Sequence, residues 1–152
     1  MIQRKHTIYL FLATIVCAIC LFMQIGSYEP ATMGAGYRLY NLYTANADQN
    51  TLSFRSAPLF LLLATAMLLS CVTIFLFRKR RLQMLLCTII KVVLLLWNIA
   101  ALLYAYLFGY EACTFHFTWA ACLPAVAFFL VWLARRGVVA DEKLVRAADR
   151  IR

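Results

Sequence analysis

Charged residues are scarce in this chain, and acidic residues are the scarcest of them. Only 14% of the 152 residues are charged, with six Asp and Glu against fifteen Lys and Arg, while 65% are hydrophobic. A soluble domain usually has about a quarter of its residues charged and about half apolar. A folded domain of this length also still exposes roughly a third of the surface that its unfolded chain would expose, so it could not hide all of these apolar residues in one core. The apolar excess therefore excludes an ordinary soluble domain and indicates a membrane protein.

Acidic residues are absent from four long apolar runs, which cover residues 8–25, 57–77, 84–108 and 117–134. Each run is close to the length of about 20 residues that a membrane-spanning helix needs. The first run could also be a signal peptide, but this alternative is weaker than a retained helix, because no small-x-small cleavage pattern follows the run. We expect an all-α membrane protein, a four-transmembrane-helix bundle that forms one membrane domain over residues 1–152.

Two local features refine this bundle. The connection between the second and third runs is so short that helices two, three and four should pack as antiparallel neighbours. Pro124 lies inside the fourth run and lacks a backbone N–H, so we expect a kink in the last helix.

Basic residues fall mostly on one side when the four runs are placed in a bilayer. Only Arg38 and Arg55 fall on the other side. The side shared by both termini holds twelve cations: Arg4, Lys5, Arg78, Lys79, Arg80, Arg81, Arg135, Arg136, Lys143, Arg146, Arg150 and Arg152. Because cationic loops are retained in the cytoplasm, we predict a multi-pass protein of the bacterial cytoplasmic (inner) membrane with both termini cytoplasmic. A net charge of +9 could also indicate a protein that binds nucleic acid, but membrane topology accounts for most of these cations. We therefore do not expect nucleic acid as a partner.

Residues 26–56 form the one sizeable hydrophilic segment, which lies outside in this topology. Residues 37–43 and 51–55 are rich in β formers, and residues 46–50 between them are turn-like. We therefore expect a small outward β-hairpin between the first two helices. Four tyrosines are expected to help anchor this loop at the membrane interface: Tyr28, Tyr37, Tyr40 and Tyr43.

The C-terminal residues 137–152 are typical of a separate short amphipathic helix. Asp141 can cap its start, and apolar residues recur afterwards at helical spacing: Leu144, Val145, Ala148 and Ile151. A basic amphipathic helix can lie on the anionic inner leaflet of the bilayer or dock on a partner protein. The sequence leaves both possibilities open.

Lys91 is the only charge inside the four runs. A lysine at the centre of a spanning helix costs about 2.5 to 3.5 kcal/mol on insertion scales. Lys91 lies about two helical turns from the cytoplasmic end, so its stem can snorkel towards the headgroups, or its ammonium can bond to a neighbouring helix. Asn98 follows seven residues later on the same face, and the pair could line a polar path for a proton or an anion. No acidic residue lies in any run, so a carboxylate-based proton relay is not available. Transport is therefore the alternative function and not the first.

Catalytic and metal-binding patterns are missing. The chain has no phosphate-binding loop and no nucleophile elbow, and His6 and His116 fall at opposite ends of the bundle. Cys113 and His116 make only half a metal site, and the six cysteines show no zinc spacing. We expect no enzymatic activity, no cofactor and no metal. Any disulfide would involve Cys20, Cys113 or Cys122 on the outer side, and the sequence does not decide whether one forms.

The two cytoplasmic ends carry the most distinctive motifs, which are MIQR (1–4), TIYL (7–10) and DEKLVR (141–146) followed by ADR (148–150). They resemble the end motifs of an uncharacterised family of small four-helix inner-membrane proteins of Bacteroidota, a domain-of-unknown-function family. The resemblance covers the whole chain in length, number of spans and loop order. It implies that the family signature lies at the inner face, and it brings no activity, cofactor or substrate.

This emphasis on the inner face favours a function by contact. Arg4 is within reach of Asp141, Glu142 or Asp149, so we predict an ion-pair clasp between the first helix and the tail. The residues predicted to mediate docking are Arg4, Asp141, Glu142, Lys143, Arg146, Asp149 and Arg150. We hypothesise a non-enzymatic accessory or assembly subunit whose partners are the lipid bilayer with its anionic inner leaflet and either another membrane protein or a second copy. The alternative is a small channel or transporter that uses Lys91 and Asn98.

Overall fold

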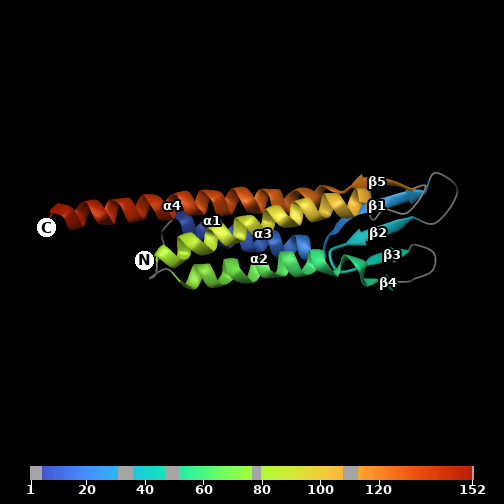
Figure 1. Cartoon of the computed structure of the whole chain (residues 1–152), viewed down its shortest axis with the longest axis horizontal. Helices are drawn as coiled ribbons and strands as arrows, with labels where there is room; N and C mark the ends of the chain where they lie inside the picture. The colour runs from blue at the N-terminus through green and yellow to red at the C-terminus, as the bar shows by residue number, and fades with distance from the viewer. Residues whose placement is uncertain (1–4, 31–35, 47–51, 77–79, 108–112, 152) are drawn as a thin grey trace.

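The protein is an elongated bundle of four helices with a small sheet at one end (Figure 1). The structure, a computed structural model, describes residues 5–30, 36–46, 52–76, 80–107 and 113–151. The helices are α1 (Lys5–Phe22), α2 (Ala57–Phe75), α3 (Arg80–Leu107) and α4 (Leu123–Ile151). We call the end with the strands the sheet end, and the opposite end, where α1 begins and α4 ends, the basic end.

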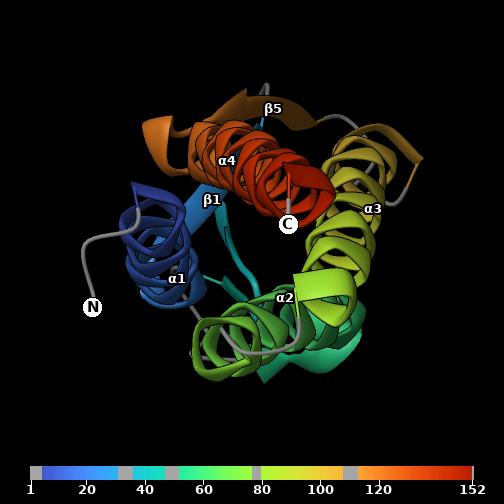
Figure 2. The ribbon, with the colours of Figure 1, turned by 90° about the vertical axis from the view of Figure 1, so that its left-hand side faces the viewer.

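The four helices form a ring in which each packs against the next. Contacts join α1 to α2, α2 to α3, α3 to α4 and α4 back to α1 (Figure 2). The expected packing of the last three helices as neighbours is confirmed. Each helix buries one stripe of side chains in the middle of the ring; on α3 this stripe contains Cys87, Ile90, Leu94, Trp97 and Ala101.

Large apolar side chains also cover the outside of the bundle. Phe11 of α1, Leu61 of α2 and Phe129 of α4 are each about 60% exposed, whereas soluble monomers rarely expose wide apolar patches. Three helical segments are long and apolar enough to cross a membrane: Phe54–Phe75, Arg81–Tyr106 and Trp119–Glu142. The apolar part of α1, His6–Phe22, is shorter.

A five-stranded antiparallel sheet closes the sheet end. Its strands are β1 (Gln24–Pro30), β2 (Tyr37–Tyr40), β3 (Thr44–Asn46), β4 (Leu52–Ser53) and β5 (Cys113–Phe117), in the order β4-β3-β2-β1-β5. Strand β2 pairs with β3, and β3 pairs with β4. The predicted single hairpin was therefore wrong in its pairing, because residues 44–46 lie between the two segments expected to pair. Strands β1 and β5 were not expected at all.

The helix boundaries at the sheet end differ from those predicted. The first apolar run was expected to be helical to residue 25, but α1 ends at Phe22 and Ile25 is buried in β1. The last run was expected to begin at residue 117, but Phe117 ends β5 and a 3-10 turn, η2 (Trp119–Cys122), precedes α4. Pro124 therefore stands in the first turn of α4, where its missing N–H is not needed. The kink inferred from an interior proline lacks its basis.

The separate C-terminal helix was also predicted wrongly. Helix α4 passes through Gly137 without interruption and continues to Ile151, so Asp141 is an interior residue and not a cap. The reason is packing against α1, since a Cβ at Gly137 would lie 3.1 Å from Cβ of His6. The glycine provides room for α1 to approach and does not mark the end of a helix.

Candidate functional site

A histidine–aspartate pair joins the first and last helices at the basic end. His6 of α1 is 4% exposed, and its Nδ1 lies 3.5 Å from Oδ2 of Asp141 on α4. The two side chains carry opposite charges only when His6 is protonated, and the Asp141 side chain is 35% exposed. The structure therefore contains a clasp between α1 and α4 that is made by His6; Arg4, the predicted partner, lies outside the described residues. The sequence placed His6 and Asp141 at the same end of the bundle, but the predicted clasp named only Arg4 as the partner of the tail.

The other predicted docking residues lie on the part of α4 that extends past its neighbours. Figure 1 shows this helix running well beyond the start of α1 and the adjoining ends of α2 and α3. Glu142 is partly exposed. The side chains of Lys143, Arg146, Asp149 and Arg150 fall outside the described residues, so their grouping on one face stays a prediction.

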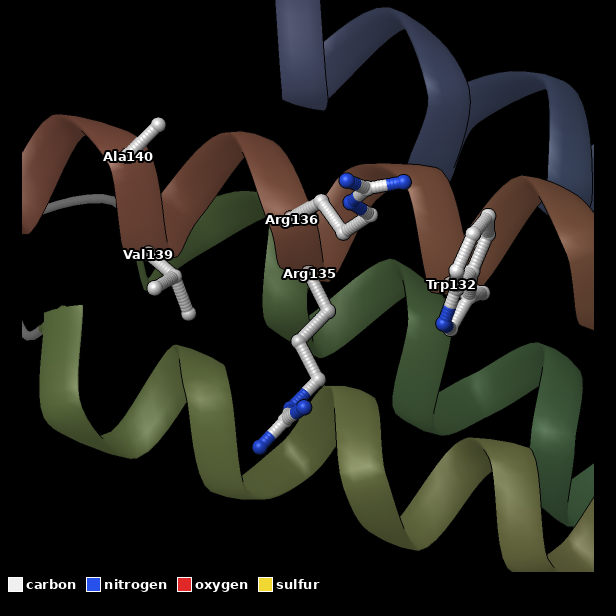
Figure 3. Close-up of a pocket in the computed structure, with 5 residues that line it drawn as sticks. All are labelled: Trp132, Arg135, Arg136, Val139 and Ala140. Carbon is white, nitrogen blue, oxygen red and sulfur yellow. The ribbon is translucent and has the colours of Figure 1, made fainter.

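Two arginines and a tryptophan line an open pocket on α4 near the basic end. The pocket has a volume of about 360 Å³ and is formed by Trp132, Arg135, Arg136, Val139 and Ala140. Figure 3 shows Arg135 extending from α4 towards α3, whereas the guanidinium of Arg136 lies 4.9 Å from the ring centre of Trp132. That distance is within the range of a cation–π interaction.

Lys91 and Asn98 lie half buried on one face of α3, beside its buried stripe. The amide nitrogen of Asn98 donates a hydrogen bond of 2.8 Å to the carbonyl oxygen of Leu94 in the same helix. The adjacent buried positions Leu94 and Trp97 are filled by large side chains. The structure thus places the two residues on one face as predicted, while a conducting path along them stays a prediction.

A buried asparagine connects the sheet to the helices. Asn41, between β2 and β3, is fully buried, and its Nδ2 donates to the carbonyl oxygen of Cys20 at 2.6 Å. Its Oδ1 accepts a hydrogen bond of 3.1 Å from Nε1 of Trp97. This one side chain therefore connects three segments: the end of α1, the turn after β2 and the middle of α3. Sequence reasoning missed Asn41, whose only signal was a lone amide within a tyrosine-rich strand segment.

Aromatic side chains fill the space between the sheet and the bundle. Tyr28 is 3% exposed, its hydroxyl donates to the carbonyl oxygen of Tyr104 at 2.8 Å, and its ring centre lies 4.6 Å from that of Phe115. Tyr28 therefore belongs to the core, and its predicted role as an interfacial anchor was wrong. The other three tyrosines, Tyr37, Tyr40 and Tyr43, are partly buried.

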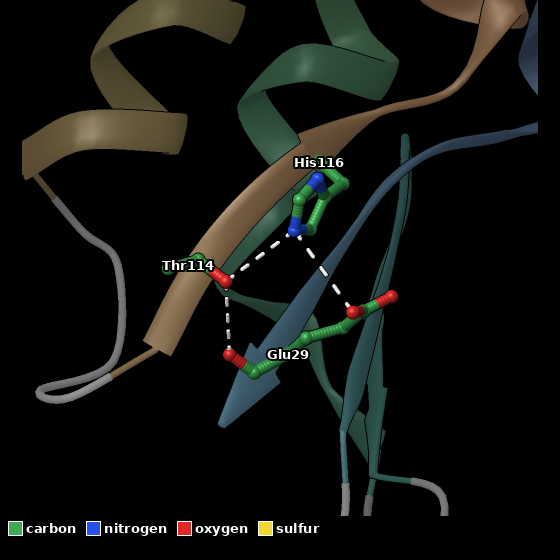
Figure 4. A network of polar contacts seen from close by, with 3 residues as sticks. All are labelled: Glu29, Thr114 and His116. Atoms are coloured by element: carbon green, nitrogen blue, oxygen red, sulfur yellow. Dashed lines mark hydrogen bonds and ion pairs between the residues drawn. The ribbon is translucent and has the colours of Figure 1, made fainter. Parts of the chain in front are cut away.

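The exposed face of β1 and β5 carries a small polar network (Figure 4). His116 Nε2 lies 3.3 Å from Thr114 Oγ1 and 3.9 Å from Glu29 Oε2, and Thr114 Oγ1 donates to the backbone oxygen of Glu29 at 3.3 Å. Cys113 is an odd number of residues from His116 along β5, so the strand alternation turns the two side chains to opposite faces. Within the described ranges no three His, Cys, Asp or Glu side chains gather to hold a metal.

All six cysteines are free thiols. Cys20 is buried, and its Sγ lies 3.6 Å from the carbonyl oxygen of Ala120 at the start of the segment leading into α4. Cys113 is partly buried and Cys122 is exposed.

The fold and its polar contacts define a mostly helical protein with three helices long and apolar enough to cross a membrane and an antiparallel sheet at one end. A family model described as a domain of unknown function (DUF4293) matches residues 2–151, and the chain belongs to this family. No curated protein matches the chain.

Proposed function

We propose that the protein is a non-enzymatic integral membrane protein of the bacterial inner membrane that acts as an accessory or assembly subunit. Apolar side chains on the outside of all four helices support insertion into lipid. The distribution of Lys and Arg supports an orientation with the basic end in the cytoplasm and the sheet outside. The expected origin in Bacteroidota rests on the family resemblance alone.

Labelling of single cysteines in intact cells tests this orientation. With the other five cysteines replaced by serine, Cys113 on β5 should react with a membrane-impermeant maleimide added from outside, because the sheet is expected to face the periplasm. With all six native cysteines replaced, a cysteine introduced at the exposed position Ala140 should react only after the inner membrane is opened. Labelling of Ala140→Cys in intact spheroplasts would contradict the proposed orientation.

The length of α4 is the observation that carries the proposal of a contact function. Its 29 residues extend about 43 Å at 1.5 Å per residue, more than the roughly 30 Å of a bilayer core. The segment beyond Asp141 leaves the ring of helices and has no neighbouring helix in the described structure (Figure 1). A helical segment held away from its own bundle, with the amphipathic pattern that its sequence predicts, is suited to bind another protein.

Removal of this segment should abolish partner binding. We expect affinity purification from native membranes to recover partner proteins with the full chain and to lose them when the chain stops after Glu142, which retains the His6–Asp141 pair. A matched control carries Arg38→Gln at the sheet end. Recovery of the same partners with both variants, or of none with the full chain, would contradict docking through α4.

The transport alternative can be separated in the same preparation. Flux of protons or anions into liposomes containing the full chain, together with its loss in Lys91→Leu, would favour a channel. The contact proposal expects no flux above that of empty liposomes.

A further inference from the structure

The pocket on α4 has the chemistry of an anion site. Nε of Arg135 is buried and has no hydrogen-bond partner, although a buried donor is normally paired. Neither Arg135 nor Arg136 forms an ion pair with an acidic side chain among the residues that the structure describes. Among the described residues, therefore, Nε of Arg135 has no acceptor and neither guanidinium is neutralised by a carboxylate.

The lining of the pocket carries a net positive charge. Among the described residues that form it, two are arginines and none is acidic. Such a lining favours a ligand with net negative charge over a zwitterion.

The depth of the pocket matches that of lipid headgroups. Arg135 lies twelve residues after the start of α4, or roughly 18 Å along the helix, and the preceding 3-10 turn adds about 8 Å. The sum of about 26 Å approaches the roughly 30 Å thickness of a bilayer core. Trp132, which is 40% exposed, lies at the level where tryptophan is enriched in membrane proteins.

An apolar surface leads from the pocket into the membrane region. Val126, Phe129 and Leu133 are exposed and share a face of α4 with Arg136 and Ala140, because they follow spacings of three and four residues. A phosphate bound by the arginines could therefore keep its acyl chain along this face. A free phosphate ion would make no use of it.

We propose that Trp132, Arg135 and Arg136 bind the phosphate of an anionic phospholipid in the inner leaflet. The guanidinium of Arg136, held above the Trp132 ring, donates charge-assisted hydrogen bonds to phosphate oxygens, and Arg135, which extends towards α3, adds positive charge to the same pocket. Val139 and Ala140 border the site on the aqueous side. The inference rests on the proposed membrane insertion, but not on the proposed partner binding.

Native mass spectrometry of the full chain in detergent micelles tests the site with two lipids of identical acyl chains, phosphatidylglycerol and phosphatidylcholine. We expect phosphatidylglycerol to bind at least about tenfold more tightly, and Arg135→Gln to remove most of that preference. Arg38→Gln, which removes the same charge at the sheet end, should leave it unchanged. Arg136→Gln provides a second variant whose exposed side chain leaves no buried group behind if Arg135→Gln fails to fold.

Three results would overturn the proposal. The first is equal affinity for the two lipids, and the second is an undiminished preference in both arginine variants. The third is displacement of phosphatidylglycerol by inorganic phosphate at similar concentration, which would assign the site to free phosphate. Because the assay contains no partner protein, loss of partner binding after truncation of α4 and loss of lipid preference are separate outcomes.

Discussion

Replacement of Asn41 by alanine should lower the free energy of unfolding by about 3 kcal/mol, because two buried groups lose their partners at once. Nε1 of Trp97 would lose its acceptor and the carbonyl oxygen of Cys20 its side-chain donor. Unfolding in mixed detergent micelles, followed by tryptophan fluorescence, measures the loss. Alkylation of Cys20, identified by mass spectrometry, should accelerate as the sheet separates from α1.

Asn98→Ala is the matched control for this prediction. Asn98→Ala also removes a side-chain amide, but the hydrogen bond that Asn98 donates goes to the carbonyl oxygen of Leu94 in its own helix. We expect it to cost less than about 1 kcal/mol, in the range of an ordinary hydrogen bond. Equal losses from the two substitutions would show that Asn41 does not couple the sheet to the helices.

Gly26→Ala should have a comparable effect on the junction of β1 and β5. A Cβ at this position would overlap the Phe115 ring and lie 2.8 Å from the carbonyl oxygen of His116. Ser27 pairs with His116 in the β1–β5 ladder, so relief of the overlap must displace paired backbone. Overpacking of this kind costs about 1 to 3 kcal/mol, and we expect the upper part of that range in thermal unfolding.

The position of β5 provides a second measurement for Gly26→Ala. Cys113, the first residue of β5, should be alkylated faster when the strand is displaced from β1. Gly36→Ala is the control, because the described atom that a Cβ there would approach is the carbonyl oxygen of Tyr28, at 3.1 Å, with no ring overlap of the kind at Gly26. An unchanged melting temperature and an unchanged rate at Cys113 in Gly26→Ala would contradict the tight packing at this crossing.

Hydrophobic runs predicted the four helices because each helix buries a stripe and also exposes apolar residues to its surroundings. Hydropathy failed at the sheet end, where Ile25 and Phe117 belong to strands but stand at the ends of apolar runs that contain no charged residue there. It also failed at Gly137, since a glycine that admits a neighbouring helix is indistinguishable in sequence from one that ends a helix. Asn41 owes its role to three segments that meet only in the folded chain.

The candidate docking surface was predictable only as a region. Charge counting placed Asp141 and its neighbours on the same side as the start of the first helix, but the contact with His6 depends on how α1 and α4 cross. The pocket at Arg135 was not predicted, because the sequence analysis used Arg135 and Arg136 only to assign the orientation of the chain in the membrane. A residue can serve as an orientation signal in the sequence and still have an unsatisfied donor in the structure.

The strand order has a consequence for the order of folding. Strand β5 is synthesised after α3, yet it pairs with β1, which directly follows α1. The first four strands come from one continuous stretch of chain, so the sheet can begin to form early but cannot be completed until the third helix is in place. Contacts between residues so distant in sequence form slowly. Closure of β5 on β1 would therefore be a late event that marks the correct assembly of the bundle.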